Sequence, residues 1–312
     1  MSVSMEEKAK WASTIITGRN SGLGLECGRQ FLSLGLTQLI LAVRSQQKGD
    51  IAAKELKTEF PEADIQVWIL DMESSPSVRE FMARCNTLER LDVAILNAGC
   101  AKQTFQRAKG NGKEMTLQVN YLNTMLLAIL LIPILKAKSS SAPGRLTLVT
   151  SDMALWVKVK DTEGSILDSI DKPENFDGAN RYSTTKLFLI MFTSKLAELV
   201  SADDIINIVN PCVVRGTRLM REAKGSSKMI FNISCFLLGR NIVDGTRQFL
   251  HSALVLGKES HGSYGDWEIR PYPVIMYTES GQKIREKLWS ETLEDLRIRD
   301  IATTLGRANK HF

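Results

Sequence analysis

Short runs of β-branched and aliphatic residues alternate with longer amphipathic segments along most of the chain. This alternation predicts a parallel sheet whose strands are joined by crossover helices. Strands are predicted at 13–17, 39–43, 64–70, 92–96, 145–150 and 204–209, and helices at 22–35, 46–58, 75–88, 115–137 and 179–200. The near-continuous apolar run at 64–70 predicts a strand buried on both faces. We therefore expect an α/β fold in which one doubly wound parallel sheet carries helices on both faces.

The length of 312 residues fits one large domain, because such a sheet and its helices would use most of the chain. We expect a single domain over 1–312, with its core at 10–260 and a C-terminal extension at 262–312. Two stretches, 152–178 and 212–241, interrupt the alternation. Both follow predicted strands at the carboxyl edge of the sheet, where open α/β sheets bind ligands. We interpret 212–241 as an apolar lid over a substrate.

Composition and charge exclude several other classes of protein. The chain has 40 basic and 35 acidic residues without a long single-sign run, so we do not expect it to bind nucleic acid. Its five cysteines form no CxxC pair and its three histidines lack a metal-binding spacing. These patterns predict neither a disulfide framework nor a metal site.

The N-terminus and the most apolar run bear on membranes. The first ten residues carry four charges and no apolar stretch, so we expect no secretory signal there. The apolar run at 125–135 has eleven residues and contains Pro133, against roughly 20 residues needed to span a bilayer. We therefore predict a buried or subunit-packing helix there, no transmembrane span and a cytoplasmic chain. A short apolar stripe at 229–238 leaves peripheral contact with a membrane surface open as an alternative.

A glycine-rich turn follows the first predicted strand and leads directly into a predicted helix, with the sequence TGRNSGLG at 17–24. Glycines let such a turn tighten, and they let backbone N–H groups approach a pyrophosphate whose charge the helix N-terminus favours. An ordinary strand-to-helix turn is the alternative. We predict that this turn contributes to a dinucleotide site through Gly18, Asn20, Ser21, Gly22, Leu23 and Gly24.

The end of the second predicted strand indicates which dinucleotide is bound. An acidic residue about 20 positions past the glycines would hydrogen-bond the ribose 2′-hydroxyl of NAD. This chain instead has Arg44 there, and a guanidinium can pair with a 2′-phosphate while stacking on adenine. Lys48 adds positive charge nearby. We therefore predict NADP(H) as the cofactor, and a plain surface arginine at a strand end is the alternative for Arg44.

Tyr182 and Lys186 are four residues apart on a predicted helix, so they lie on one face about one turn from each other. A tyrosine hydroxyl titrates near pH 10 in water, and a nearby ammonium favours the phenolate. This effect brings the tyrosine toward proton exchange at neutral pH. Because a solvated pair with this spacing also arises by chance, the pair gains its meaning only from the residues around it.

Three further polar motifs follow strands or begin a helix. Ser151 follows the predicted strand at 145–150, Asn120 lies near the start of the apolar helix, and Asn-Ala-Gly at 97–99 follows the fourth strand. A hydroxyl at Ser151 could hydrogen-bond a substrate oxygen beside Tyr182. Each motif alone has an ordinary alternative, since Ser and Asn are common in turns and helix caps.

Together, and in this order, these motifs resemble the short-chain dehydrogenase/reductase family over roughly residues 10–260. The matching positions are TGxxxGxG at 17–24, Asp71 after the third strand, NAG at 97–99, Asn120, Ser151, YxxxK at 182–186 and Pro211. The resemblance implies a Rossmann fold and an oxidoreductase that acts on alcohols or carbonyls.

The resemblance also implies a catalytic tetrad of Asn120, Ser151, Tyr182 and Lys186. Tyr182 would be the general acid for carbonyl reduction or the base for alcohol oxidation, and Ser151 would orient the substrate. Lys186 would hold the nicotinamide ribose and lower the pKa of the tyrosine. Asn120 would support a water that relays protons to the lysine.

Further cofactor contacts are implied by the same resemblance. Asp71 would contact the adenine, and the backbone near Val214 and Thr217 would contact the carboxamide. The adenosine ribose would be lined by Asn97, Ala98 and Gly99.

Two features depart from the family pattern. Asn210-Pro211 is followed by Cys212 where the family usually has glycine, which puts the contact near Val214 and Thr217 in doubt. A reactive thiol is one interpretation of Cys212, but no activating base is evident and a small buried side chain fits better. The number of residues between Ser151 and Tyr182 exceeds the number that is common in the family. Longer separations resemble the retinol-dehydrogenase-like branch and reductases of fungal secondary metabolism.

Apolar residues in the two interrupting stretches indicate a hydrophobic ketone or secondary alcohol as the substrate. They are Met153, Leu155, Trp156, Met220, Phe231, Phe236 and Leu237. The hypothesis is an NADP(H)-dependent oxidoreductase of secondary-metabolite biosynthesis, for example of polyketides or terpenoids. Alternatives are a cofactor-binding protein without redox turnover, or an isomerase or dehydratase on the same scaffold. A homodimer or homotetramer is an expectation from the resemblance, because the apolar helix and the YxxxK helix commonly pair between subunits in this family.

Overall fold

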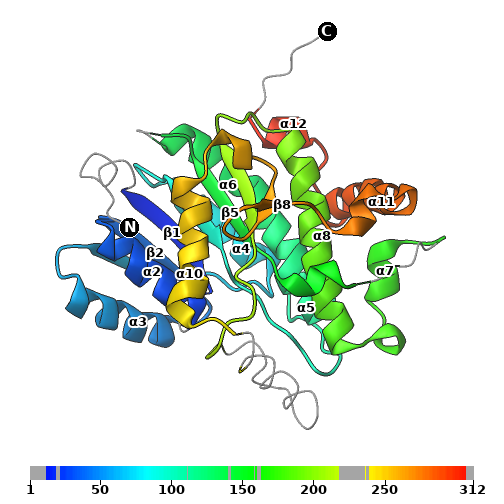
Figure 1. Cartoon of the computed structure of the whole chain (residues 1–312), viewed down its shortest axis with the longest axis horizontal. Coiled ribbons are helices and arrows are strands. Elements are labelled where there is room, and N and C mark those ends of the chain that lie inside the picture. Colours follow the sequence, from blue (N-terminus) through cyan, green and yellow to red (C-terminus); the bar gives the residue numbers. More distant parts are fainter. Residues whose placement is uncertain are drawn as a thin grey trace.

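The computed structural model describes residues 12–18, 22–110, 112–139, 142–157, 159, 163–217, 236 and 239–306 (Figure 1). Within these residues one sheet holds eight strands in the order β3-β2-β1-β4-β5-β6-β7-β8. The strands are β1 (Ser13–Thr17), β2 (Gln38–Val43), β3 (Asp64–Ile69), β4 (Val93–Leu96), β5 (Arg145–Val149), β6 (Ile205–Val209), β7 (Tyr264–Gly265) and β8 (Ile269–Arg270). All neighbours are parallel except β7 and β8, which are antiparallel. The predicted doubly wound α/β fold is confirmed.

Helices cover both faces of the sheet because each central strand buries side chains on both sides. Ile15 and Ile16 are consecutive on β1 and belong to different buried clusters, as the pleat of a strand requires. One face carries α2 (Leu23–Ser33), α3 (Gln46–Glu59) and α10 (Ile242–Leu250), with α10 beside α2 in Figure 1. The other face carries α4 (Ser75–Cys85), α6 (Asn123–Lys138) and α8 (Gly178–Glu198).

The prediction that the third strand is buried on both faces is wrong. β3 is the edge of the sheet and pairs only with β2 among the described strands. Of its six residues only Trp68 is fully buried, and Ile69 is 44% exposed. An edge strand has no neighbour on one side, so an apolar run in the sequence does not by itself ensure burial.

The apolar run at 125–135 lies in one continuous helix whose bounds are close to the predicted 115–137. It comprises α5 (Met115–Leu117), the π-helical turn η1 (Gln118–Leu122) and α6, and it passes through Pro133. By length and composition alone this helix of 24 residues could cross a membrane. In the fold, 89% of its most apolar window is buried, against the sheet, α4 and α8. It is therefore placed as the core helix of this domain.

The C-terminal extension packs against the sheet and α8. β7 pairs with β6, and α11 (Glu279–Asp295) packs on α8. Trp289 stacks on Phe192 with ring centroids 4.5 Å apart, and the Tyr121 hydroxyl lies 2.7 Å from the Thr292 hydroxyl. Leu288 is fully buried in this contact. Part of α8, a helix that the family resemblance expected to pair between subunits, is thus covered by α11 of the same chain.

Shorter elements connect the main ones. They are η2 (Asp152–Leu155), α7 (Ile166–Ile170), η3 (Pro173–Asn175), η4 (His251–Val255), η5 (Lys258–Ser260), η6 (Val274–Tyr277) and α12 (Ile301–Thr304). Of the predicted lid at 212–241, residues 218–235 and 237–238 lie outside the described residues. Its two ends meet where Val214 forms a parallel bridge with Arg240.

Candidate active site

The candidate site lies where β1, β4, β5 and β6 end, at the carboxyl edge of the sheet. Parallel strands bring their exits to one edge, so motifs far apart in the sequence become neighbours. The Thr17 hydroxyl accepts a hydrogen bond from the backbone N–H of Ala98 at 2.9 Å. The Asn97 amide donates to the carbonyl of Thr17 at 3.0 Å. The glycine-rich turn and the Asn-Ala-Gly segment are thereby held against each other.

The glycine-rich turn has a backbone that requires glycine. Gly18 has φ of 74°, and a Cβ there would lie 2.7 Å from the Cα of Ala98. Gly22 has φ of 69°, and a Cβ there would meet nothing within 4 Å. Gly22 precedes α2, whose first turn contains Leu23 and Gly24 and has no side-chain cap. The open helix N-terminus fits a pyrophosphate. Asn20 and Ser21 lie outside the described residues.

Charged side chains gather where β2 and β3 end. Arg44 forms an ion pair with Glu73, whose side chain is only 8% exposed, while that of Arg44 is 63% exposed. Asp71 accepts a hydrogen bond from the backbone N–H of Glu73 at 3.0 Å. Lys48 is exposed on the first turn of α3. The guanidinium of Arg44 therefore reaches solvent beside the buried carboxylate of Glu73. The sequence analysis did not identify Glu73, although it follows Asp71 by only two positions.

Asn120 lies inside the π-helical turn η1 and is fully buried. Its Oδ1 accepts from the backbone N–H of Cys100 at 2.8 Å, and its Nδ2 donates to the carbonyl of Cys100 at 2.8 Å. The same Nδ2 lies 3.3 Å from the Thr185 hydroxyl of α8. π-Helical turns recur at functional sites because they redirect side chains within a helix. Here the turn places Asn120 between the β4 exit and α8.

Tyr182 and Lys186 lie one turn apart on α8, as the spacing predicted. Both are nearly buried, at 6% and 4% exposure. The Lys186 Nζ lies 5.8 Å from the centre of the Tyr182 ring and donates to the carbonyl of Val149 at 2.8 Å. The Ser151 hydroxyl hydrogen-bonds the phenol of Tyr182.

The Asn-Ala-Gly segment brings Asn120 into the same group. A Cβ at Gly99 would lie 3.3 Å from the Asn120 Oδ1 and 3.8 Å from the Lys186 Nζ. The structure thus brings together Asn120, Ser151, Tyr182 and Lys186, with the backbone of Gly99 between two of them.

The electrostatics of the pair differ from the expectation. Burial raises the pKa of Tyr182 to about 12, although the hydrogen bond from Ser151 acts in the opposite direction. Burial lowers the pKa of Lys186 to about 8, partly offset by Cys100. The lowered tyrosine pKa expected from a neighbouring ammonium is therefore not found in the chain itself, because desolvation disfavours the charged form of both groups. At neutral pH the phenol is protonated and able to donate.

The exit of β6 contributes a polar group that sequence reasoning missed. The Asn210 amide donates to the Asp152 carboxylate and, at 3.3 Å, to the hydroxyl of Tyr264. The Asn210 Oδ1 accepts from the backbone N–H of Cys212 at 3.0 Å. Asp152 directly follows Ser151, so this network fixes the chain after β5 against the chain after β6. The position of Asn210 at a strand end was the available signal.

Comparison with known proteins identifies the family. The short chain dehydrogenase profile matches residues 12–158. The chain is 44% identical to a short chain dehydrogenase/reductase, mfmJ, of Annulohypoxylon moriforme over 92% of this chain and 85% of that protein. It is also 44% identical to a short chain dehydrogenase, virL, of Hypocrea virens, over 90% of this chain and 84% of that protein. The chain belongs to the short-chain dehydrogenase/reductase family.

Solved structures of the short-chain dehydrogenase/reductase family share the fold. L-sorbose reductase from Gluconobacter frateurii, complexed with NADPH and L-sorbose, superposes with a TM-score of 0.62 at 19% identity. The match covers 85% of this chain and 98% of that one. A short-chain dehydrogenase from Sphingobium yanoikuyae in complex with NADPH gives a TM-score of 0.59 at 19% identity, over 77% and 83% of the two chains.

Cys212 stands where a short-chain dehydrogenase/reductase usually has glycine, and its backbone adopts the conformation that glycine favours. Its φ of 59° is in the left-handed region. Cys212 is half-buried, and burial raises the pKa of its thiol, which fits an unreactive side chain. Val214 is buried against Gly245 of α10, and Thr217 is half-buried. The departure at Cys212 therefore leaves the left-handed turn in place.

We expect Cys212→Gly to change the free energy of unfolding by less than about 1 kcal/mol, because relief of backbone strain offsets the added freedom of the unfolded chain. Cys212→Val should lower it by about 1–2 kcal/mol, because a β-branched residue resists the left-handed region. Denaturant unfolding of both variants checks this. A valine variant as stable as the wild type would contradict the strain argument.

Three of the apolar residues assigned to the substrate lie directly after Ser151. Met153, Leu155 and Trp156 are exposed, and the indole of Trp156 is the most so at 81%. Phe236 is 75% exposed. Of the other substrate residues, Met220, Phe231 and Leu237 lie outside the described residues.

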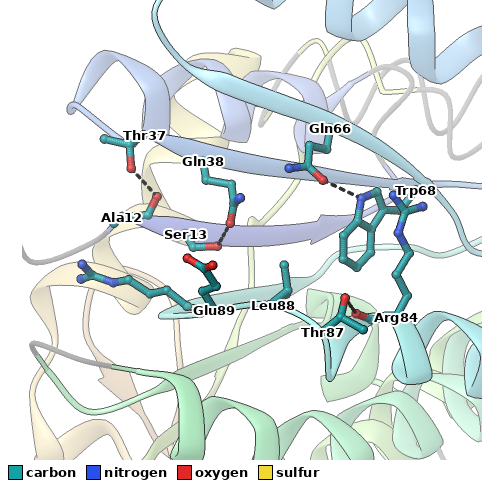
Figure 2. A pocket seen from close by; sticks show the side chains of 11 residues that line it. Ala12, Ser13, Thr37, Gln38, Gln66, Trp68, Arg84, Thr87, Leu88 and Glu89 are labelled. Carbon is teal, nitrogen blue, oxygen red and sulfur yellow. Dashed lines mark hydrogen bonds between the residues drawn. The ribbon is translucent and has the colours of Figure 1, made fainter.

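A separate pocket lies at the amino ends of β1 and β2, away from the carboxyl ends that form the candidate site (Figure 2). Ser13 and Gln38, at the starts of β1 and β2, hydrogen-bond through their side chains at 2.6 Å. The guanidinium of Arg84 stacks 4.0 Å from the ring centre of Trp68, whose N–H donates to Gln66 at 2.9 Å. This pocket includes none of the predicted site residues.

Within the described residues, no cluster of His, Cys, Asp and Glu could hold a metal ion. Cys85, Cys100 and Cys212 are free thiols, and Cys235 lies outside the described part. His261 lies in a loop and contacts the carbonyl of Ala197 through Nε2 at 2.9 Å.

Proposed function

We propose that this chain transfers a hydride between NADP(H) and a hydrophobic ketone or secondary alcohol. The observation that carries the proposal is the convergence of Asn120, Ser151, Tyr182 and Lys186 beside a glycine-rich turn with an open helix N-terminus. A phenol that can exchange a proton, next to a serine hydroxyl and a buried lysine, is an arrangement suited to carbonyl chemistry.

The proposed cofactor would lie along the carboxyl edge of the sheet. Gly18, Gly22 and the first turn of α2 would hold the pyrophosphate. Arg44 and Lys48 would pair with the 2′-phosphate of the adenosine, and Asp71 would contact the adenine. The segment at 97–99 would line the adenosine ribose. When bound, NADPH supplies the hydride, and NADP accepts one. Complexes of related folds with NADPH support a nicotinamide cofactor.

The chain's own residues would donate and accept the proton that accompanies hydride transfer. In reduction the Tyr182 hydroxyl donates its proton to the carbonyl oxygen of the substrate as that oxygen gains negative charge. Ser151 donates a hydrogen bond to the same oxygen and holds it beside the phenol. Lys186 would bind the nicotinamide ribose, and Asn120 would support the proton relay toward that lysine. In oxidation the same proton returns to Tyr182.

We further propose a substrate with an apolar body, because Met153, Leu155 and Trp156 present exposed apolar surface within five residues of Ser151. The similarity to short chain dehydrogenases of several fungi supports a role in secondary metabolism. A chain with cofactor binding alone, or with isomerase or dehydratase activity, is the alternative that an assay must separate.

The function is tested by following NADPH oxidation at 340 nm with trans-1-decalone and with 9,10-phenanthrenequinone as probes. Turnover with a hydrophobic ketone, and preference for NADPH over NADH, is the expected result. Binding of NADPH without turnover on any ketone would favour the binding-protein alternative. Product formation without net NADPH consumption would favour isomerisation or dehydration.

The pH dependence should differ between the two directions. Because the pKa of Tyr182 is raised to about 12, the phenol stays protonated at neutral pH and kcat for reduction should vary less than about twofold between pH 6 and 8. Alcohol oxidation needs the phenolate, so its kcat should rise by up to about tenfold per pH unit. Initial rates of both reactions in matched buffers measure this. A reduction rate that rises with pH would contradict the assignment.

A further inference from the structure

A buried carboxylate begins the helical segment that carries Asn120. Glu114 is fully buried and caps α5, accepting hydrogen bonds from the backbone N–H groups of Thr116 and Leu117 at 2.9 Å each. From α5 the chain runs without a break into η1 and Asn120. The position of Glu114 therefore sets where this segment starts.

The same carboxylate is paired with the residue that precedes Tyr182. The Arg181 Nη1 lies 3.1 Å from the Glu114 Oε2, and the two side chains are only 3% and 0% exposed. The Arg181 guanidinium also lies 5.2 Å from the ring centre of Phe176. One ion pair thus joins the start of the Asn120 segment to the first turns of α8.

The stretch between Ser151 and Tyr182 is tied to the same point. The backbone N–H of Glu114 donates to the Asp171 Oδ1 at 2.6 Å. Arg107 pairs with that carboxylate at 3.2 Å. Three segments that are distant in the sequence therefore meet at Glu114: the chain before Asn120, the chain before Tyr182, and the long segment that separates Ser151 from Tyr182.

We propose that Glu114 and Arg181 are positioning residues that hold Asn120 in register with Tyr182 and Lys186. This inference rests on the proposed function. The only described hydrogen bond from the Asn120 side chain to α8 is its 3.3 Å contact with Thr185, so the ion pair supplies the charged anchor between the two helices. A displacement near 1 Å of a group in a catalytic constellation costs about 10²-fold in rate. Their effect on turnover therefore goes beyond their effect on folding.

The test compares Arg181→Met, Arg181→Lys and the double variant Glu114→Gln/Arg181→Met with the wild type. Arg181→Met alone leaves the Glu114 carboxylate buried without its partner, so the Tm of this variant should fall. The double variant removes both charges and should recover most of the Tm. We expect kcat with phenanthrenequinone to fall about 10–100-fold in Arg181→Met and in the double variant. The dissociation constant of NADPH, measured by its fluorescence, should stay within twofold. Lysine at 181 keeps the charge and should restore most of kcat.

The matched control is an exposed ion pair on α11, Glu279 with Lys283 at 2.8 Å. The variant Glu279→Gln/Lys283→Met should match the wild type in both Tm and kcat. Recovery of kcat together with Tm in the double 114/181 variant would overturn the inference, because the pair would then be purely structural. A wild type that binds NADPH but reduces no probe ketone would overturn the proposed function, and this inference with it.

Discussion

Replacement of Tyr182 by phenylalanine is expected to lower kcat for ketone reduction by about 10²–10⁴-fold, because the variant lacks the hydroxyl that donates the proton. The phenol is 6% exposed and hydrogen-bonded to Ser151, so the ring should keep its place in the variant. NADPH binding should be retained, which separates a chemical loss from a binding loss. Single-turnover rates and NADPH fluorescence measure the two quantities.

A matched control is Tyr277→Phe, which removes a tyrosine hydroxyl from a side chain that is 65% exposed. Its kcat should equal that of the wild type. Turnover by Tyr182→Phe within tenfold of the wild type would assign the proton transfer to another group and would remove the main support for the proposed mechanism.

Replacement of Arg44 by glutamine is expected to weaken NADPH binding by about 10–100-fold while NADH binding changes little, because a charge-assisted hydrogen bond contributes about 1.5–3 kcal/mol. The side chain of Arg44 is 63% exposed and the partner carboxylate of Glu73 is nearly buried. One side of the guanidinium is thus held by Glu73 and the other faces solvent. A 2′-phosphate would bind on the side that faces solvent.

Two further variants keep this prediction specific. Because Arg44→Gln leaves Glu73 buried without its cation, the double variant Arg44→Gln/Glu73→Gln tests whether lost stability, rather than lost phosphate contact, explains the effect. Arg247→Gln removes an arginine from an exposed pair on α10 and should leave both dissociation constants unchanged. Equal loss of NADPH and NADH binding in the Arg44 variants would contradict a contact to the 2′-phosphate.

The covering of α8 by α11 bears on the subunit contact that the resemblance implied. Trp289 stacks on Phe192, and Arg285 of α11 contacts the Ser194 hydroxyl at 3.1 Å and pairs with Glu198. A homodimer that paired through α8 would have to use a face of this helix that α11 leaves uncovered. The C-terminal segment that the sequence marked only as an extension is part of the core.

Local patterns were sufficient for much of the fold and for part of the candidate site. The spacing of Tyr182 and Lys186 needed only the periodicity of a helix, and glycine at 18 and 22 needed only the left-handed turn between a strand and a helix. The parallel direction of the strands followed from the alternation of strands and helices along the sequence. The roles of the tetrad and of Arg44 stay predictions, which the two variants above address.

Other features could not be predicted because they depend on contacts between distant segments. The exposure of β3 depends on the strand order, and the two-residue strands β7 and β8 are too short to show periodicity. The π-helical turn at Asn120 has no sequence pattern of its own. The pairing of Glu114 with Arg181 joins two helices that only the sheet brings together.

The sequence alone determined which side chains could take part in proton transfer and which turn could receive a phosphate, because residue identity and near-neighbour spacing decide both. Tertiary structure alone decided their electrostatic state. Burial raises the pKa of Tyr182 to about 12 and lowers that of Lys186 to about 8, which spacing along one helix could not indicate. The physical reason is that desolvation is set by all the segments packed around a group, and these come from the whole chain.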